Sequence, residues 1–250
     1  NTAEVIAGYQ QQYPGRIHYG RMEQNSGVNA TRNRIIEEAV KLAYDAYIVW
    51  MDDDDYLLEN CLADAATAIQ EHPEYVWYCL DCIYEDGTSI TRIQQYGELS
   101  YLYDYMFGKR IRGDVTNIVK VDAIGDIRFC TQFRNAEIWY FWTHLSERYA
   151  LFAVPKPGSV KEYLPGGITK NGFNRDKAFA VLKLKIATLE PMVGRKPLLH
   201  QYTSLAKCYY LDGDYANARK YLALVWRLNP AYVRQYPHWL KLGLKALLPG

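Results

Sequence analysis

In the first half of the chain, segments with the apolar spacing of a helix alternate with apolar segments of strand length. Between residues 25 and 45 the apolar residues lie three or four positions apart, which predicts a helix with a charged outer face. The continuous apolar run at 46–51 has the length of a strand and predicts a central strand covered on both faces. A helix at 56–73 and a strand at 74–87 repeat this order. Strands that alternate with helices predict a layered α/β fold with a largely parallel sheet.

The rest of the chain divides into a mixed region and a purely helical one. Before residue 172 we expect a helix at 1–14, a strand at 16–22, a helix at 97–110, a strand and turn at 113–129, a helix at 135–149 and a proline-interrupted strand at 150–164. From about residue 174 onward the pattern is helical only. We therefore predict an α/β domain at 1–172 and a small all-α extension at 173–250.

The helical extension contains one helix pair. Residues 199–230 have the layout of a tetratricopeptide-type pair, with a turn at Gly213 and a closing Pro230. A single pair cannot bury its apolar face alone, so we expect it to dock on the α/β domain of its own chain; a homodimer surface is the alternative. The last segment, 236–250, mixes lysines with tryptophan and leucine, and is either a packed terminal helix or a helix on a membrane surface.

Charge, cysteine content and hydropathy exclude several classes of protein. The 29 basic and 28 acidic residues give a net charge of +1, which provides no general attraction to nucleic acid or anionic lipid. The 5 cysteines are scattered without the spacing of a zinc site and are read as reduced thiols. No apolar stretch reaches the roughly 20 residues that a membrane-spanning helix needs. We expect a cytoplasmic protein, peripheral at the inner face of the membrane if 236–250 binds lipid.

Four consecutive aspartates, Asp52 to Asp55, follow the apolar run at 46–51. In α/β sheets, ligands bind beyond the carboxyl ends of the strands. Strand alternation would place Asp52 and Asp54 on one side and Asp53 on the other. Two converging carboxylates make an oxygen site for Mg²⁺ or Mn²⁺ that leaves positions open for phosphate. The alternative is a solvated acidic turn in which Asp55 favours the N-terminus of the next helix.

Three segments in register resemble the family 2 glycosyltransferases of the GT-A fold. They are NTAEVIAGY, QNSGVNATRNRIIEEA and AYIVWMDDDDYLLENCL, and the matching residues are Asn25, Gly27, Ala30, Arg32, Asn33, Ala39, Asp52, Asp54 and Asp55. In looser form the resemblance covers residues 1 to 170 and leaves out the helical tail. It implies a layered α/β/α sheet and transfer of a sugar from a nucleotide-diphosphate donor to an acceptor.

The resemblance also implies a donor site. Asp52 and Asp54 match the family's D-x-D motif, which holds Mn²⁺ or Mg²⁺ and touches the sugar nucleotide. Arg32 matches a basic position near the nucleotide; its alternative is an exposed helix arginine. With Asp53 inside the motif, the expected donor-binding set is Arg32, Asp52, Asp53 and Asp54.

The expected catalytic base is Glu137. In the family a Glu-Asp pair opens a helix behind the acceptor site, and the Asp is commonly the base of inverting members. Here NAEIWYFWTHL places Glu137 at the Glu position and Ile138 at the Asp position. Inverting transfer needs a carboxylate to deprotonate the acceptor hydroxyl. Glu137 can do so if its side chain reaches; otherwise it is only a carboxylate at a helix N-terminus. Asp122 and Asp126 are weaker candidates.

Two further departures from the family pattern concern a histidine and the start of the chain. Many relatives have a metal-binding His after the late strand, where this chain has Pro165, Gly166 and Gly167. Relatives also carry about 40 residues, roughly two strands and a helix, before the position of Asn1. We expect the natural protein to include that strand-helix-strand segment.

The first hypothesis is a metal-dependent, inverting glycosyltransferase that acts on a glycan or lipid-linked acceptor in surface polysaccharide biosynthesis. The alternative is a non-catalytic GT-A-like adaptor that uses its helical tail to bind partners; the missing Asp and His favour it. A nucleotidyltransferase is a third hypothesis. The helix that carries Arg32 and Asn33, just before the acidic segment, argues against it.

Overall fold

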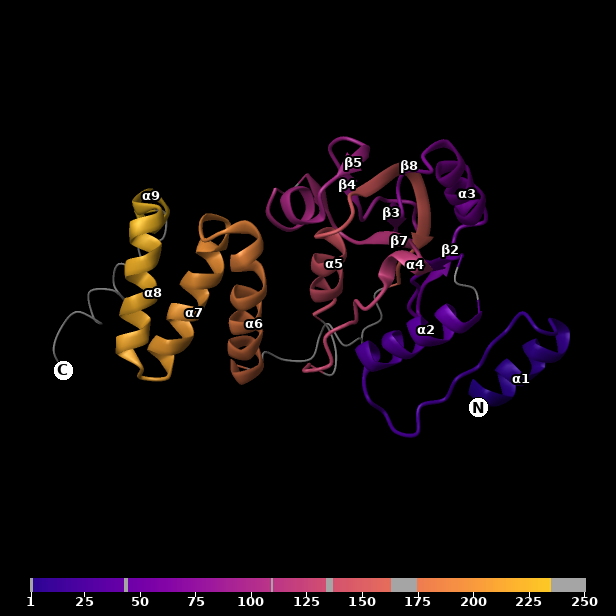
Figure 1. The fold of residues 1–250 in the computed structure, drawn as a ribbon, viewed down its shortest axis with the longest axis horizontal. Coiled ribbons are helices and arrows are strands. Elements are labelled where there is room, and N and C mark those ends of the chain that lie inside the picture. The colour runs from indigo at the N-terminus through magenta and orange to yellow at the C-terminus, as the bar shows by residue number, and fades with distance from the viewer. Residues whose placement is uncertain (1, 43–44, 109, 134–136, 163–174, 235–250) are drawn as a thin grey trace.

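The structure is a computed structural model that describes residues 2–42, 45–108, 110–133, 137–162 and 175–234. We call the described residues up to 162 the α/β part and residues 175–234 the helical extension. Figure 1 shows the helical extension beside the α/β part, with its first helix nearest to it. The predicted boundary at 172 falls within 163–174, outside the described residues, and stays a prediction.

Six strands of the α/β part form one mixed sheet. They are β1 (Tyr47–Val49), β2 (Tyr56–Leu57), β3 (Trp77–Ile83), β5 (Gly97–Leu99), β7 (Val115–Lys120) and β8 (Leu151–Val160). The order is β1-β7-β3-β8-β2, and β5 also pairs with β8. Two further strands, β4 (Arg92–Ile93) and β6 (Ile111–Arg112), pair separately.

The prediction of a largely parallel sheet was wrong. Among the described strands only β3 and β8 run parallel; the other pairs are antiparallel. Parallel neighbours need a crossover connection, usually a helix that returns the chain to the same end of the sheet. The connection from β3 to β7 instead contains short strands and the π-helix η1 (Tyr101–Phe107), so β7 returns in the opposite direction.

The expected central strand lies at an edge of the described sheet, because β1 pairs only with β7 there. Its two faces are nevertheless covered, as predicted. Ile48 joins an apolar cluster with Ile36 on one face, whereas Tyr47 and Val49 pack against a second cluster on the other.

The helices of the α/β part are α1 (Thr2–Gln12), α2 (Val28–Leu42), α3 (Cys61–Glu71), α4 (Val121–Ile124) and α5 (Trp139–Ser146). All but α4 lie in segments predicted as helical; α4 lies in the segment predicted as a strand and turn. The helix predicted at 97–110 is the π-helix η1, because its first residues pair with β8 as β5. The helix expected from 56 begins later because Tyr56–Leu57 pairs with β8 as β2. The strand expected at 16–22 is irregular, since no described strand pairs with it. Figure 1 shows α1 apart from the sheet, and none of its residues is buried.

Two apolar clusters lie on opposite faces of the sheet and confirm the layered α/β class. One contains residues of α2, α4 and α5, including Ile36, Ile124 and Phe141. The other contains Ala65 of α3 with Tyr78 and Leu80 of β3. The proline-interrupted strand is continuous as β8; its irregularity is a register shift against β3 around Asp81.

The helical extension consists of α6 (Arg175–Val193), the 3-10 turn η3 (Lys196–Leu198), α7 (Leu199–Leu211), α8 (Tyr215–Leu228) and α9 (Pro230–Arg234). Helices α7 and α8 form the expected pair and lie side by side (Figure 1); its tetratricopeptide character stays a prediction. Among the residues described, no helix has the length and apolar character needed to cross a membrane. Segment 236–250 lies outside them.

A third apolar cluster joins the extension to the α/β part. Leu102 of η1 and Trp139 of α5 belong to it from one side. The members from the extension are Leu189, Leu198, Leu199, Tyr202 and Val225. The extension therefore docks on the α/β part of its own chain, as expected.

Candidate active site

A cavity of about 320 Å³ opens at the carboxyl ends of β1 and β8, next to the start of β7. Its wall brings together Arg32, Asp52 and Glu137, which were predicted from widely separated sequence segments. Asp53 and Asp54 are not part of this wall. The position agrees with the general rule that ligands bind beyond the carboxyl ends of strands.

The four aspartates form a turn and do not continue the strand. Strand β1 ends at Val49, and the N–H of Asp55 donates to the carbonyl of Asp52 at 3.3 Å. Strand alternation therefore does not apply, and the prediction that Asp52 and Asp54 share one side on that basis was wrong. Only Asp52 faces the cavity; Asp53 is exposed and Asp54 is half-buried.

Arg32 holds Asp52 at the cavity wall. Its Nη2 donates to Oδ1 of Asp52 at 2.7 Å, and its side chain is only 17% exposed, against 49% for Asp52. The guanidinium also lies 5.5 Å from the ring centroid of Phe129. Arg32 is therefore more than an exposed helix arginine, and it places a positive charge in the cavity.

Two asparagines fix the helix that carries Arg32. Asn33 donates to the carbonyl of Phe129 at 3.0 Å and accepts from its N–H at 2.7 Å. Asn29 donates to the carbonyl of Cys130 at 2.8 Å. The helix begins after Gly27, whose φ of 87° is one that residues with a side chain rarely adopt. The motif around Arg32 thus serves to place that one side chain.

Asp55 forms a second, more buried ion pair, with Lys161 at the end of β8. The side chains are 4% and 18% exposed. Burial by itself would lower the pKa of Lys161, but the hydrogen bond and charge of Asp55 raise it above its ordinary value. Lys161 therefore stays protonated at neutral pH and also lines the cavity. Sequence reasoning missed this lysine; its place near the end of the strand predicted at 150–164 was the available signal.

Glu137 has an unusual backbone conformation. With a φ of 62° it is the non-glycine residue in the left-handed region among those the structure describes. Its carboxylate accepts a hydrogen bond from the indole N–H of Trp139, and its carbonyl accepts from the N–H of Tyr140 at 3.2 Å. The carboxylate makes no capping bond to α5. Strained residues of this kind cluster at functional sites.

The weaker candidates for the base lie elsewhere. Asp126 is exposed and pairs with Arg148 at 2.8 Å, which holds the pKa of its carboxyl below the ordinary value. Asp122 pairs with Lys120 at 3.4 Å. Neither lines the cavity. The carboxylates that do are Asp52, Asp114 and Glu137, and of these Glu137 is the one that was predicted as the base.

Aromatic side chains form much of the remaining wall. They come from β1's end, η1, α5 and the loop before it: Trp50, Tyr101, Tyr105, Phe129, Trp139 and Trp142. Aromatic faces stack well on sugar rings and nucleotide bases, and such rings also fill ordinary cores. The sequence reasoning identified none of them as part of the site.

The carboxylates fit a metal ion that takes most of its ligands from outside the protein. Within the described ranges, no group of three or more His, Cys, Asp or Glu residues could cage a metal. Asp52 is half-exposed, and Arg32 engages only its Oδ1. Mg²⁺ typically binds through one or two carboxylates together with substrate phosphates and water. Asp52 can offer such a contact.

Comparison with known proteins identifies the family to which this chain belongs. No match to the chain was found among the curated proteins. A family model, described as Glycosyl transferase family 2, matches residues 1–137, the segment from α1 to Glu137. Enzymes of this family take a sugar from a nucleotide-sugar donor and pass it to an acceptor. The chain therefore belongs to glycosyl transferase family 2 and is a glycosyltransferase with the GT-A type of α/β fold.

Proposed function

We propose that the chain is an inverting, metal-dependent glycosyltransferase that moves a sugar to a hydroxyl of a glycan or lipid-linked acceptor, in surface polysaccharide biosynthesis. One observation carries the proposal: Arg32, Asp52 and Glu137 line the same cavity. This cavity therefore contains both residues that can bind the donor and a carboxylate that can act as the catalytic base. The acceptor class rests on the family alone.

The donor side is defined by Arg32, Lys161 and Asp52. Arg32 and Lys161 bring positive charge to the cavity, where the donor diphosphate carries its negative charge. Asp52, with Asp54 next in the motif, would hold Mn²⁺ or Mg²⁺; the bound ion would supply further neutralisation of the diphosphate. Arg32 orients the Asp52 carboxylate for that contact. The aromatic wall supplies surfaces for the sugar and the base.

Glu137 is the proposed base. Its carboxylate takes the proton of the acceptor hydroxyl while that oxygen bonds to the anomeric carbon and the bond from that carbon to the diphosphate oxygen breaks. A single displacement of this kind inverts the configuration of the sugar. The indole N–H of Trp139 holds the carboxylate in place for the attack. Ile138, which also lines the cavity, contributes only apolar surface there.

The test is release of nucleoside diphosphate from a panel of sugar nucleotides with Mn²⁺ or Mg²⁺. We expect slow release without acceptor and faster release with it. Asp52→Asn should reduce turnover about 100-fold or more, since a motif carboxylate at the cavity is lost. Asp53→Asn is the matched control, because Asp53 is exposed and outside the wall. Equal loss in the two variants would contradict the assignment of Asp52.

A non-catalytic adaptor is the second candidate, and the isoleucine at position 138 favours it. No release from any common donor, together with no metal-dependent thermal shift, would support the adaptor over the enzyme. We further propose a cytoplasmic location, at the inner face of the membrane where lipid-linked acceptors are reached.

A further inference from the structure

The helical extension packs against the wall of the cavity that carries the proposed base. Trp139 lines the cavity and also belongs to the apolar cluster that joins the two parts of the chain. On the extension's side this cluster includes Leu189 of α6. The matched family segment ends at Glu137, so α6 lies outside it. A helix from outside the matched segment thus reaches the active-site wall.

Lys185 of α6 lies over the indole of Trp139. Its Nζ is 5.2 Å from the ring centroid, within the range of a cation–π contact. Burial lowers the pKa of the Lys185 ammonium below its ordinary value, and the negative charge of Glu137 acts in the opposite direction. Lys185 and Glu137 are therefore electrostatic neighbours, with the indole as their common partner.

The same indole connects the two charges through its N–H. Its Nε1 donates to Oε2 of Glu137. A cation over the ring face draws electron density from the indole and makes the N–H a stronger donor, in the way hydrogen-bonded chains polarise one another.

We propose that Lys185 is a positioning residue of the active site, which acts through Trp139 to orient Glu137, so that the helical extension completes the catalytic site. The inference rests on the proposed function, because it assigns to Glu137 the role of base. It gives the extension a part in the reaction beyond covering apolar surface.

Other charged and titratable groups share the cavity with Glu137. Arg32 faces it from α2, Asp52 from the turn after β1, Asp114 from the start of β7 and Lys161 from the end of β8. Tyr101 and Tyr105 face it from η1. Lys185 differs from all of these because it comes from the extension and lies over the indole that holds the carboxylate.

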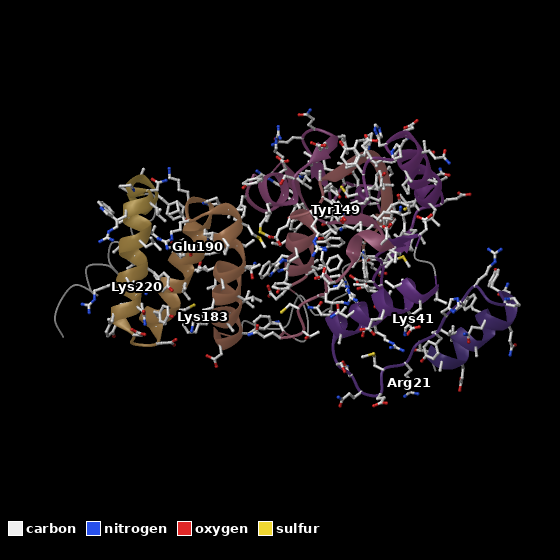
Figure 2. The ribbon with its side chains drawn as sticks, viewed as in Figure 1. Arg21, Lys41, Tyr149, Lys183, Glu190 and Lys220 are labelled. Atoms are coloured by element: carbon white, nitrogen blue, oxygen red, sulfur yellow. The ribbon has the colours of Figure 1, made fainter. Side chains whose placement is uncertain are left out.

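The first test compares Lys185→Met, Lys185→Arg and Lys183→Met in the full chain. Lys183 lies two residues away on α6 (labelled in Figure 2), but its Nζ is 3.9 Å from the ring centroid of Phe179 and 5.6 Å from that of Tyr209 of α7. It therefore makes the same kind of contact away from the cavity. Methionine keeps the apolar stem of lysine, so the fold should persist, as thermal melting will verify.

We expect Lys185→Met to reduce kcat about tenfold and to leave KM for the donor unchanged, because a misplaced base slows the chemical step without weakening donor binding. Lys185→Arg should restore most of the turnover, since arginine keeps a cation over the indole. Lys183→Met should match the wild type. An unchanged kcat in Lys185→Met, or an equal loss in Lys183→Met, would overturn the inference.

The second test does not depend on activity. The ¹H–¹⁵N resonance of the Trp139 indole, assigned by its loss in Trp139→Phe, reports how fast its N–H exchanges with solvent, and the hydrogen bond to Glu137 slows this exchange. Exchange should be faster in Lys185→Met than in the wild type, and unchanged in Lys183→Met. An inactive wild-type chain with faster exchange in Lys185→Met would contradict the proposed function and support the positioning role. An active chain with equal exchange rates would do the reverse.

Discussion

Glu137 shows how one residue can combine strain with function. A left-handed backbone costs a residue with a side chain about 1–2 kcal/mol. Two hydrogen bonds stabilise this conformation: the carboxylate accepts one from the indole N–H of Trp139, and the carbonyl accepts one from the N–H of Tyr140. Glu137 lines the same cavity as Asp52, and the N-cap of α5 is its neighbour Ile138.

Replacing Glu137 by glutamine removes the base and keeps an acceptor for the Trp139 N–H. We expect Glu137→Gln to reduce transfer to acceptor by about 100- to 10,000-fold with little change in donor binding. Single-turnover assays and donor titration by calorimetry measure the two effects separately. Glu147→Gln, on an exposed residue just after α5, serves as the control. Full turnover in Glu137→Gln would assign the base to another group.

At the scale of elements, Glu190 ties α6 to α7. Its Oε1 accepts from Nε of Arg195 at 2.6 Å, and its Oε2 accepts from the hydroxyl of Tyr202 at 2.6 Å. The hydrogen bond from Tyr202, and then that from Arg195, hold the pKa of Glu190 below its ordinary value of 4.5. A group with a depressed pKa in the folded state stabilises the fold above its unfolded pKa, and this contribution disappears as pH falls through the folded pKa.

The stability of the helical extension should therefore fall below about pH 4.5. Glu190→Gln should melt a few degrees lower than the wild type at pH 7 and lose part of the decrease on acidification. Circular dichroism melts from pH 7 to pH 3 measure both effects. Glu71→Gln, on an exposed face of α3, controls for loss of one carboxylate. Parallel pH dependence in Glu190→Gln and the wild type would refute this role.

For the whole molecule, the apolar cluster between the two parts decides whether they act as one unit. Leu189 is fully buried in it, together with Leu102 of η1 and Trp139 of α5. Figure 1 shows α6 as the helix of the extension nearest to α5. Trp139 donates a hydrogen bond to the proposed base. Weaker packing of this cluster should therefore lower activity as well as the stability of the fold.

Leu189→Ala should lower the free energy of unfolding by about 2–5 kcal/mol, the usual range for a buried leucine. It should also lower turnover at temperatures where the chain is still folded. Leu205→Ala is the matched control, since Leu205 is 1% exposed on α7 but is not a member of the joining cluster. Denaturant melts and donor-release rates, measured on both variants, provide the comparison. Equal turnover in the two would show that the cluster does not support the site.

The layered α/β class, the helix carrying Arg32 and the acidic run were predicted from local patterns, and the glutamate before α5 was predicted from the resemblance to the family. Helical spacing, strand length and charge clustering are properties of a short stretch of chain, so consecutive residues are enough to show them. The direction of β7, the edge position of β1 and the selection of Asp52 as the aspartate at the cavity were not predictable in this way.

The sequence by itself determined most of the helices and strands and the chemical groups that are available, because local spacing and residue type settle both. Segments 16–22 and 56–57 differ from the prediction because strand pairing depends on residues far away in the chain. Only the tertiary structure decided which groups meet. Lys161 pairs with Asp55 across 106 positions, and Lys185 reaches Trp139 from another part of the fold. Such partners depend on the path of the whole chain, and no local pattern records that path.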